Sequence, residues 1–145
     1  MADVVLVFPK TGFDIKRVSV DMPLALLSAS VYVARDFEVK VIDQRLDPQW
    51  EETLKDELEK APLCVGVSCL TGPQIAHGLQ VSRIVKESGV QAKVVWGGVH
   101  ATLLTEQTVS HPLVDIAVAG EGEFAFRDLV HALKNGSDLS EVKGN

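Results

Sequence analysis

The sequence predicts a doubly wound α/β fold, in which a five-stranded parallel sheet carries helices on both faces. Short runs rich in β-branched residues alternate with amphipathic stretches along the whole 145-residue chain. These runs are also apolar almost throughout, as strands are when helices cover both faces of their sheet. The expected strand order is 2-1-3-4-5, which is that of flavodoxin-like members of the Rossmann class. The predicted strands are residues 4–8, 38–43, 63–69, 93–96 and 114–119.

The segments between the strands carry helix signals. The clearest is at Asp47 and Pro48, where Asp can cap a helix and Pro fits its first turn, before Trp50, Leu54 and Leu58 recur at i, i+4 and i+8. The other predicted helices are one that Pro23 opens with Leu24, Leu27 and Val31 inward, one that Pro73 opens with Ile75, Leu79 and Val85 among its apolar positions, and a last one with Phe126, Leu129, Val130 and Leu133 that Asn135 and Gly136 end.

Composition indicates one domain. With 46% hydrophobic and 23% charged residues, the chain has enough apolar surface to bury a core. Residues 1–136 are the expected domain. The polar residues 137–145 are typical of a linker, so we expect a fragment whose C-terminal domain is absent.

Charge and hydropathy exclude two kinds of partner. The net charge is -6, the pI is about 5.1 and the cationic residues are scattered, so we expect no nucleic-acid partner. No apolar run approaches the ~20 residues of a membrane span. Cys64 and Cys69 fall on opposite faces of a predicted strand, which argues against a disulfide and favours a reducing, cytoplasmic location.

Candidate binding residues gather where the predicted strands end, because ligands of open parallel sheets bind beyond the carboxyl ends of the strands. Glycines and hydroxyl groups dominate three of these ends, residues 68–72, 97–100 and 120–123. Two successive glycines, Gly97 and Gly98, let a bulky group lie directly on the backbone, although a tight turn explains them as well.

Other residues at these ends have two interpretations each. The hydroxyls of Ser68 and Thr71 can bind a ligand or cap the helix that Pro73 opens, and for Thr71 capping is favoured. His100 can contact a ligand or a metal, or face water in a first helical turn. A helix dipole explains Glu121 and Glu123 without any site.

Catalytic motifs are missing from the sequence. It contains no GxSxG, no GxxxxGK[ST], no GxGxxG after the first strand, and no CxxC or HExxH. The four histidines are dispersed. We therefore expect a chain that is not catalytic alone.

Two motifs resemble cobalamin-binding domains, which carry Ser-x-Leu after the third strand and Gly-Gly after the fourth, somewhat under thirty residues apart. Here Ser68, Cys69 and Leu70 precede Gly97 and Gly98 by 26 residues, 71 to 96. The resemblance implies that cobalamin is the cofactor and that these residues line a slot for its nucleotide tail. In that family the dimethylbenzimidazole of the tail is withdrawn from cobalt.

The Asp-x-His-x-x-Gly motif, whose histidine ligates cobalt in the methionine synthase and mutase branch, is absent. No histidine precedes His77, so the resemblance implies a base-off, His-off state. This departure points to the branch joined to radical S-adenosylmethionine (SAM) domains. Similar stretches are residues 22–27, 65–68, 96–102 and 120–123, and they are most like the Mg-protoporphyrin monomethyl ester cyclases and related methylases.

The resemblance assigns ten binding residues. Ser68, Leu70 and Thr71 are expected at the tail slot, Gly97, Gly98 and His100 along the nucleotide loop, Gly120 and Glu121 near the far side of the tail, and Gly12 and Met22 under the corrin face. A [4Fe-4S] cluster and SAM would belong to the absent C-terminal radical SAM domain, and no metal ligand is assigned in this chain.

Four alternatives remain. A flavodoxin-like domain would want a hydroxyl-rich first loop, and Lys10, Thr11 and Gly12 match it poorly. A receiver domain would want an aspartate where Ser68 stands. A small stand-alone enzyme, such as a nucleotide-sugar or NAD-using transferase, would need a phosphate-binding motif, and the sequence has none. The fourth alternative is a stand-alone interaction module.

Overall fold

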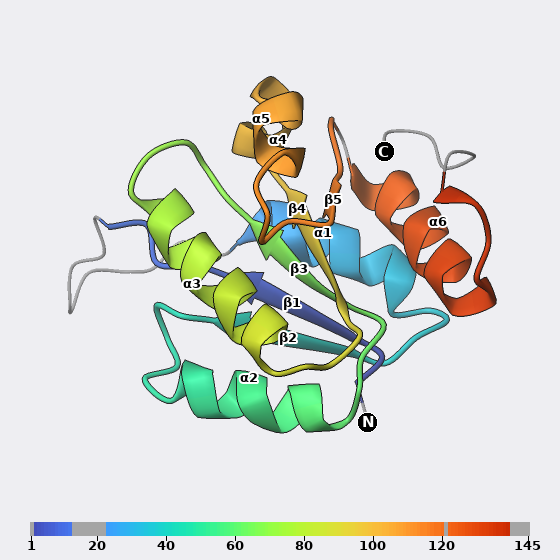
Figure 1. Ribbon diagram of the computed structural model, residues 1–145. Coiled ribbons are helices and arrows are strands. Elements are labelled where there is room, and N and C mark those ends of the chain that lie inside the picture. Colours follow the sequence, from blue (N-terminus) through green and yellow to red (C-terminus); the bar gives the residue numbers. More distant parts are fainter. Residues whose placement is uncertain (1, 13–22, 121, 140–145) are drawn as a thin grey trace.

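The computed structural model describes residues 2–12, 23–120 and 122–139. Its sheet has five strands in the order β2-β1-β3-β4-β5, and every neighbouring pair is parallel, which confirms the predicted fold (Figure 1). The strands are β1 (Val4–Phe8), β2 (Val39–Asp43), β3 (Cys64–Ser68), β4 (Lys93–Gly97) and β5 (Ile116–Ala117).

Helices cover both faces of this sheet. They are α1 (Leu24–Val33), α2 (Trp50–Glu59), α3 (Gln74–Glu87), α4 (Val99–Leu103), α5 (Thr105–Val109) and α6 (Gly122–Asn135). The helices α2 and α3 lie on one face, and α1 and α6 lie against each other on the opposite face (Figure 1). The short helices α4 and α5, which the sequence did not indicate, project beyond the carboxyl end of β4.

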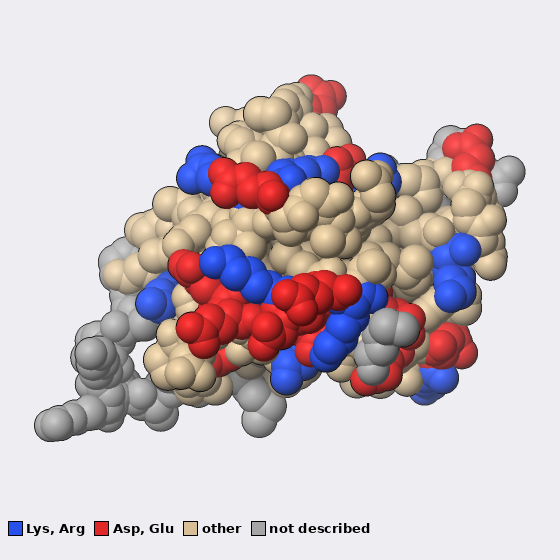
Figure 2. All heavy atoms as spheres, turned by 60° about the horizontal axis from the view of Figure 1, so that its bottom comes forward, with Lys and Arg blue, Asp and Glu red and all other residues tan. Residues whose placement is uncertain are grey.

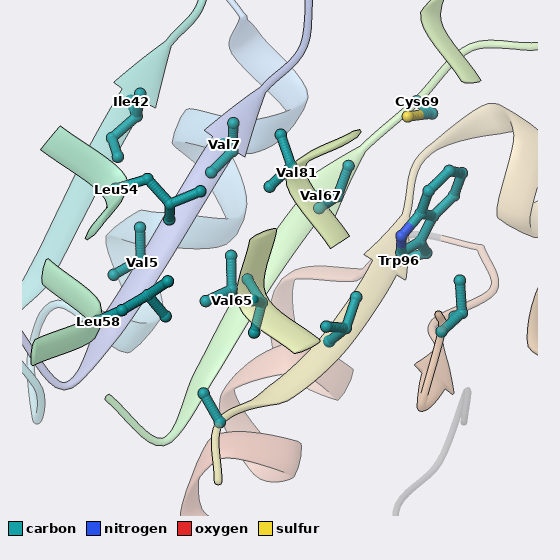
Figure 3. Close-up of a cluster of buried hydrophobic side chains, with 14 of the residues drawn as sticks. Val5, Val7, Ile42, Leu54, Leu58, Val65, Val67, Cys69, Val81 and Trp96 are labelled. Atoms are coloured by element: carbon teal, nitrogen blue, oxygen red, sulfur yellow. The ribbon is translucent and has the colours of Figure 1, made fainter. Parts of the chain in front are cut away.

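Alternation along the strands divides the core into two clusters. Val5, Val65 and Trp96 point toward α2 and α3, where Leu54 and other side chains pack on them (Figure 3). Their neighbours Val4, Cys64 and Val95 point toward α1 and α6. Figure 3 shows the first cluster, which is filled from β2 across to β4. We call the side of the sheet that faces α2 and α3 the α2/α3 face, and the opposite side the α1/α6 face.

The two cysteines belong to opposite faces, as predicted. Cys64 lies in the cluster of the α1/α6 face and Cys69 in the cluster of the α2/α3 face, and both are free thiols. Burial raises the pKa of each thiol from 9.0 to about 12. Both are therefore structural hydrophobes.

The predicted inward residues of α2 and the predicted end of α6 are confirmed, but α2 begins at Trp50 after the N-cap Gln49, so Asp47 does not cap the helix and Pro48 precedes its first turn. Trp50, Leu54 and Leu58 are buried, and Asp47 accepts hydrogen bonds from the Gln49 amide at 2.9 Å and the Thr53 hydroxyl at 2.9 Å. The α6 helix ends at Gly136, where a φ of +66° and a bond from Ser137 N to the Ala132 carbonyl make a glycine C-cap.

The predicted inward side of α1 is wrong. Leu24 and Val31 are 67% and 55% exposed, whereas Leu26 and Val33 are buried. The helix is apolar almost all round, so its sequence pattern cannot choose a side. Packing against α6 makes the choice instead.

Charged side chains gather on the outer side of α2. Figure 2 shows acidic and basic groups interleaved there, and Glu51 pairs with Lys55 on this surface. Mixed signs at helical spacing are typical of a solvated surface. Among the described residues, no helix is long and apolar enough to cross a membrane.

Candidate functional site at the carboxyl edge of the sheet

Small residues at the ends of β3 and β4 leave space on the α1/α6 face. The register pairs Ser68 with Gly97 and Gly66 with Val95. Because side chains alternate along a strand, Gly66, Ser68 and Gly97 all fall on the same face as Val95. A large residue at Ser68 or Gly97 would fill the space beside α1 and α6, and at Gly66 even a Cβ would lie 2.6 Å from Leu6 Cδ2.

A pocket of about 540 Å³ opens at this place. Its walls are apolar, and its size falls within the range of about 300–1,000 Å³ typical of small-molecule sites. The lining comes from α1, from β1, β3 and β4, from α4, and from the segment after β5 together with the start of α6. It includes Leu6, Leu26, Ala29, Gly66, Ser68, Val95, Gly97, Gly98, Val99, Thr102, Leu103, Val118, Gly120, Glu123 and Phe126.

Gly98 occupies a position that strongly favours glycine. Its φ is +93°, and a Cβ built on it would lie 3.0 Å from both the Cys69 carbonyl and the Ser68 hydroxyl. Two backbone hydrogen bonds keep Gly98 close to Cys69. One runs from Cys69 N to the Gly97 carbonyl and the other from His100 N to the Cys69 carbonyl. The tight turn and the bare backbone are therefore two consequences of the same glycine.

Gly97 differs from its neighbour. Among the described residues, no atom beyond its chain neighbours lies within 4 Å of a Cβ built on it, and Gly97 lines the pocket. The absent side chain therefore leaves its space to the pocket.

Thr102 ties two of the predicted site glycines together. Its hydroxyl donates to the Gly98 carbonyl at 2.9 Å and accepts from the Gly120 amide at 2.9 Å. Gly120 has a φ of +78°, so the turn between β5 and α6 also depends on a glycine. The role of Thr102 could not be predicted from the sequence, since a bond between distant loops leaves no local signal.

Leu70, Thr71 and His100 lie together but do not line the pocket. The Thr71 hydroxyl lies 3.1 Å from His100 Nδ1, and His100 is only 7% exposed, with its ring edge-on to Trp96. Leu70 is 50% exposed, and its amide donates to Gln74. Their predicted ligand contacts stay predictions.

Two interpretations of these residues are corrected. Thr71 does not cap α3, because that helix begins after Pro73 without a side-chain cap and the Thr71 hydroxyl faces His100. His100 does not face water, because the chain folds it against Trp96. Glu123 lies in the first turn of α6, as the helix-dipole interpretation requires.

The first loop begins from a fixed position. Gln74 donates to the Pro9 carbonyl at 2.9 Å, and Lys10 N donates to the side chain of Gln44 at 2.9 Å. Both glutamines are buried, and the sequence analysis missed them. Gly12 packs on Pro73, since a Cβ there would lie 2.5 Å from the Pro73 Cβ.

Two predicted site residues, Met22 and Glu121, lie outside the described residues. Of the rest, the pocket brings together Ser68, Gly97, Gly98 and Gly120. Gly66 was missed, although its spacing of two from Ser68 places both on one face of a strand. Within the described part of the chain, no three His, Cys, Asp or Glu side chains are grouped as a metal site would require.

Comparison with known proteins identifies the family. A model of the B12 binding domain family matches residues 7–130. An uncharacterized methyltransferase of Pyrococcus horikoshii, PH0819, is 32% identical over 145 residues, which cover 97% of this chain and 31% of that protein. The present chain thus spans about a third of the length of this relative.

Solved structures share the fold. The radical SAM methyltransferase TsrM from Kitasatospora setae, with cobalamin and a [4Fe-4S] cluster bound, aligns with a TM-score of 0.79 at 24% identity, over 99% of this chain and 27% of that chain. The cobalamin-dependent SAM radical enzyme OxsB, with aqua-cobalamin and SAM bound, aligns with a TM-score of 0.76 at 23% identity, over 99% of this chain and 20% of that chain. Fold, glycine-lined edge and family match agree, and the chain belongs to the B12 binding domain family.

Proposed function

We propose that this domain holds cobalamin at the carboxyl edge of its sheet, with the nucleotide tail in the pocket of the α1/α6 face and the lower base withdrawn from cobalt. The observation that carries the proposal is the 540 Å³ apolar pocket that opens directly beside Gly97 and Gly98. An aromatic base suits its walls, and the bare backbone of the two glycines suits the close approach of a bulky chain.

The residues of the pocket have distinct roles in this proposal. Ser68 lines the pocket, so its hydroxyl can reach a ligand there. Gly97 leaves room, Gly98 brings the backbone close, and Thr102 fixes the positions of Gly98 and Gly120. These groups bind and orient the cofactor, while cobalt-centred chemistry such as methyl transfer belongs to the cobalamin itself.

The histidines support a His-off state. None occurs before His77, so the first loop has no imidazole to offer cobalt. His100 is buried beside Trp96 with its Nδ1 directed at Thr71, and His131 pairs with Asp36 at 2.9 Å.

The relatives suggest the wider context. PH0819 and TsrM are described as methyltransferases, and OxsB as a cobalamin-dependent SAM radical enzyme. We propose that residues 1–136 serve as the N-terminal cobalamin module of a cytoplasmic radical SAM methylase or cyclase, with residues 137–145 beginning the linker. The narrower likeness to Mg-protoporphyrin monomethyl ester cyclases stays a prediction.

Spectroscopy of the bound cofactor tests the proposed state. Hydroxocobalamin is added to the purified chain, free cofactor is removed by gel filtration, and the complex is reduced to cob(II)alamin. The expected electron paramagnetic resonance spectrum is base-off, without nitrogen hyperfine coupling from an axial ligand. The variant His100→Gln should give the same spectrum. Nitrogen coupling in the wild-type complex would contradict the proposal, and so would failure to retain any cobalamin.

A further inference from the structure

The inner walls of the pocket carry almost no polar groups. Leu6 and Val95 come from the sheet, Leu26 from α1, and Val118 and Phe126 from the segment around the start of α6. All five side chains are buried, at 2–5% exposure. A ligand that enters this end of the pocket therefore loses its contact with water and gains apolar neighbours.

Few polar side chains line the rest of the pocket. Thr102 is already engaged, since its hydroxyl both donates to Gly98 and accepts from Gly120. Glu123 lies in the first turn of α6, and Ser28 and Ser68 contribute one hydroxyl each from α1 and β3. Besides Thr102, the pocket thus offers three polar side chains, whereas the inner end formed by the five buried residues offers none, so polar atoms of a ring that enters this end are left without side-chain partners.

Natural corrinoids differ in the lower base of the nucleotide tail. A dimethylbenzimidazole without its bond to cobalt presents a single ring nitrogen, for which one serine hydroxyl is enough. Adenine presents an amino group and several ring nitrogens. Buried polar groups without partners oppose binding, as seen where sites reject ligands that leave such groups unpaired.

We propose that this pocket selects corrinoids by their lower base, accepting a benzimidazole and disfavouring a purine. The inference rests on the proposed placement of the nucleotide tail. Ser68 is the polar contact of the selected base, and the five buried apolar side chains are the walls that reject the amino group of a purine.

Titration of the full 145-residue chain with three corrinoids tests the selection. The probes are hydroxocobalamin, the corresponding cobamide with adenine as its lower base, and cobinamide, which has no nucleotide tail. We expect the adenine cobamide to bind at least ten-fold more weakly than cobalamin, which corresponds to about 1.4 kcal/mol. Cobinamide should also bind more weakly than cobalamin, because it leaves the pocket unfilled.

The outcomes distinguish the two proposals. Equal affinity for the adenine cobamide and cobalamin, with weaker binding of cobinamide, overturns base selection and leaves the tail in the pocket. Equal affinity for all three corrinoids overturns the placement of the tail and the selection with it. Binding of none overturns the proposed function itself.

A matched pair of variants locates the selection. Val118→Thr adds a hydroxyl to the pocket wall, whereas Val114→Thr makes the same change at a residue of similar burial in the other core cluster. Val118→Thr should reduce the preference for cobalamin over the adenine cobamide, and Val114→Thr should leave it unchanged. A preference that neither variant changes, in chains that melt at similar temperatures, would contradict selection by this wall.

Discussion

The two faces of the same sheet differ in how their glycines are used. On the α2/α3 face, Gly78 makes room for a side chain, because a Cβ there would lie 3.1 Å from the buried ring of Trp96. The Trp96 indole fills that room and donates to Ser82 at 3.0 Å. On the α1/α6 face, the space beside Gly97 stays open. One face therefore stabilises the fold along its whole length, while the other gives up packing at its carboxyl end.

This difference explains why the pocket opens where it does. Each strand presents alternate residues to the two faces, so large residues such as Val67 and Trp96 can fill one face while Ser68 and Gly97 leave the other open. Lost packing is a cost in stability that a binding site commonly carries. The predictions below test whether the faces differ in this way.

The largest expected effect comes from removing one leucine from each face. Leu54→Ala on the α2/α3 face should lower the free energy of unfolding by an amount near the top of the range of about 2–5 kcal/mol, because its neighbours surround it completely. Leu26→Ala should cost about 2 kcal/mol, because the Leu26 side chain already borders the pocket. Denaturant unfolding of both variants measures the difference. Equal costs would show that the faces are packed alike.

The two adjacent glycines should respond in opposite ways. Gly98→Ala should destabilise the fold by about 1–3 kcal/mol, since its backbone conformation is essentially restricted to glycine and the new Cβ approaches the Cys69 carbonyl. Gly97→Ala should change stability by less than about 1 kcal/mol, because its Cβ has space. Thermal unfolding compares the two variants. A large loss from Gly97→Ala would mean that the space is not free.

Loss of the Thr102 hydroxyl should have a smaller effect. Thr102→Val removes the link between Gly98 and Gly120, and it should destabilise the fold by about 1 kcal/mol and weaken cobalamin binding. Thr105→Val is the control, since that hydroxyl donates to the Ala101 and Thr102 carbonyls of α4. Isothermal titration calorimetry with cobalamin should show weaker binding by Thr102→Val than by Thr105→Val. Similar affinities in both variants would remove Thr102 from the site.

Ionisation of the two thiols should not change the stability of the fold at neutral pH. Their folded-state pKa of about 12 lies above the unfolded value of 9.0, so folded and unfolded chains bind the same protons below pH 9. Above pH 9 the unfolded chain releases protons that the folded chain keeps, and stability should fall as the pH rises toward 12. At pH 7 iodoacetamide should alkylate neither Cys64 nor Cys69. Rapid labelling of Cys64 would contradict its burial and would show that the pocket extends into the interior of the α1/α6 face.

The sequence allowed the sheet to be predicted because its signals are local. Each strand is a short β-branched run, and Gly136 ends a helix by its own backbone preference. The inward side of α1 could not be predicted, since α6 chooses between nearly equivalent apolar sides. Likewise, Thr102 joins two loops that are distant in the sequence. Gly66 could have been predicted as a pocket residue, because strand periodicity places it on the same face as Ser68.

The affinity of a Gly97 series for hydroxocobalamin tests the central claim most directly. Side chains of increasing size at this position should enter the pocket, because no atom of the described residues beyond the chain neighbours lies within 4 Å of a Cβ on Gly97. From Gly97→Ala to Gly97→Val to Gly97→Leu, the account predicts a stepwise loss of binding by chains that stay folded. Unchanged affinity across a folded series would contradict the account, because cobalamin would then not use the pocket on the α1/α6 face.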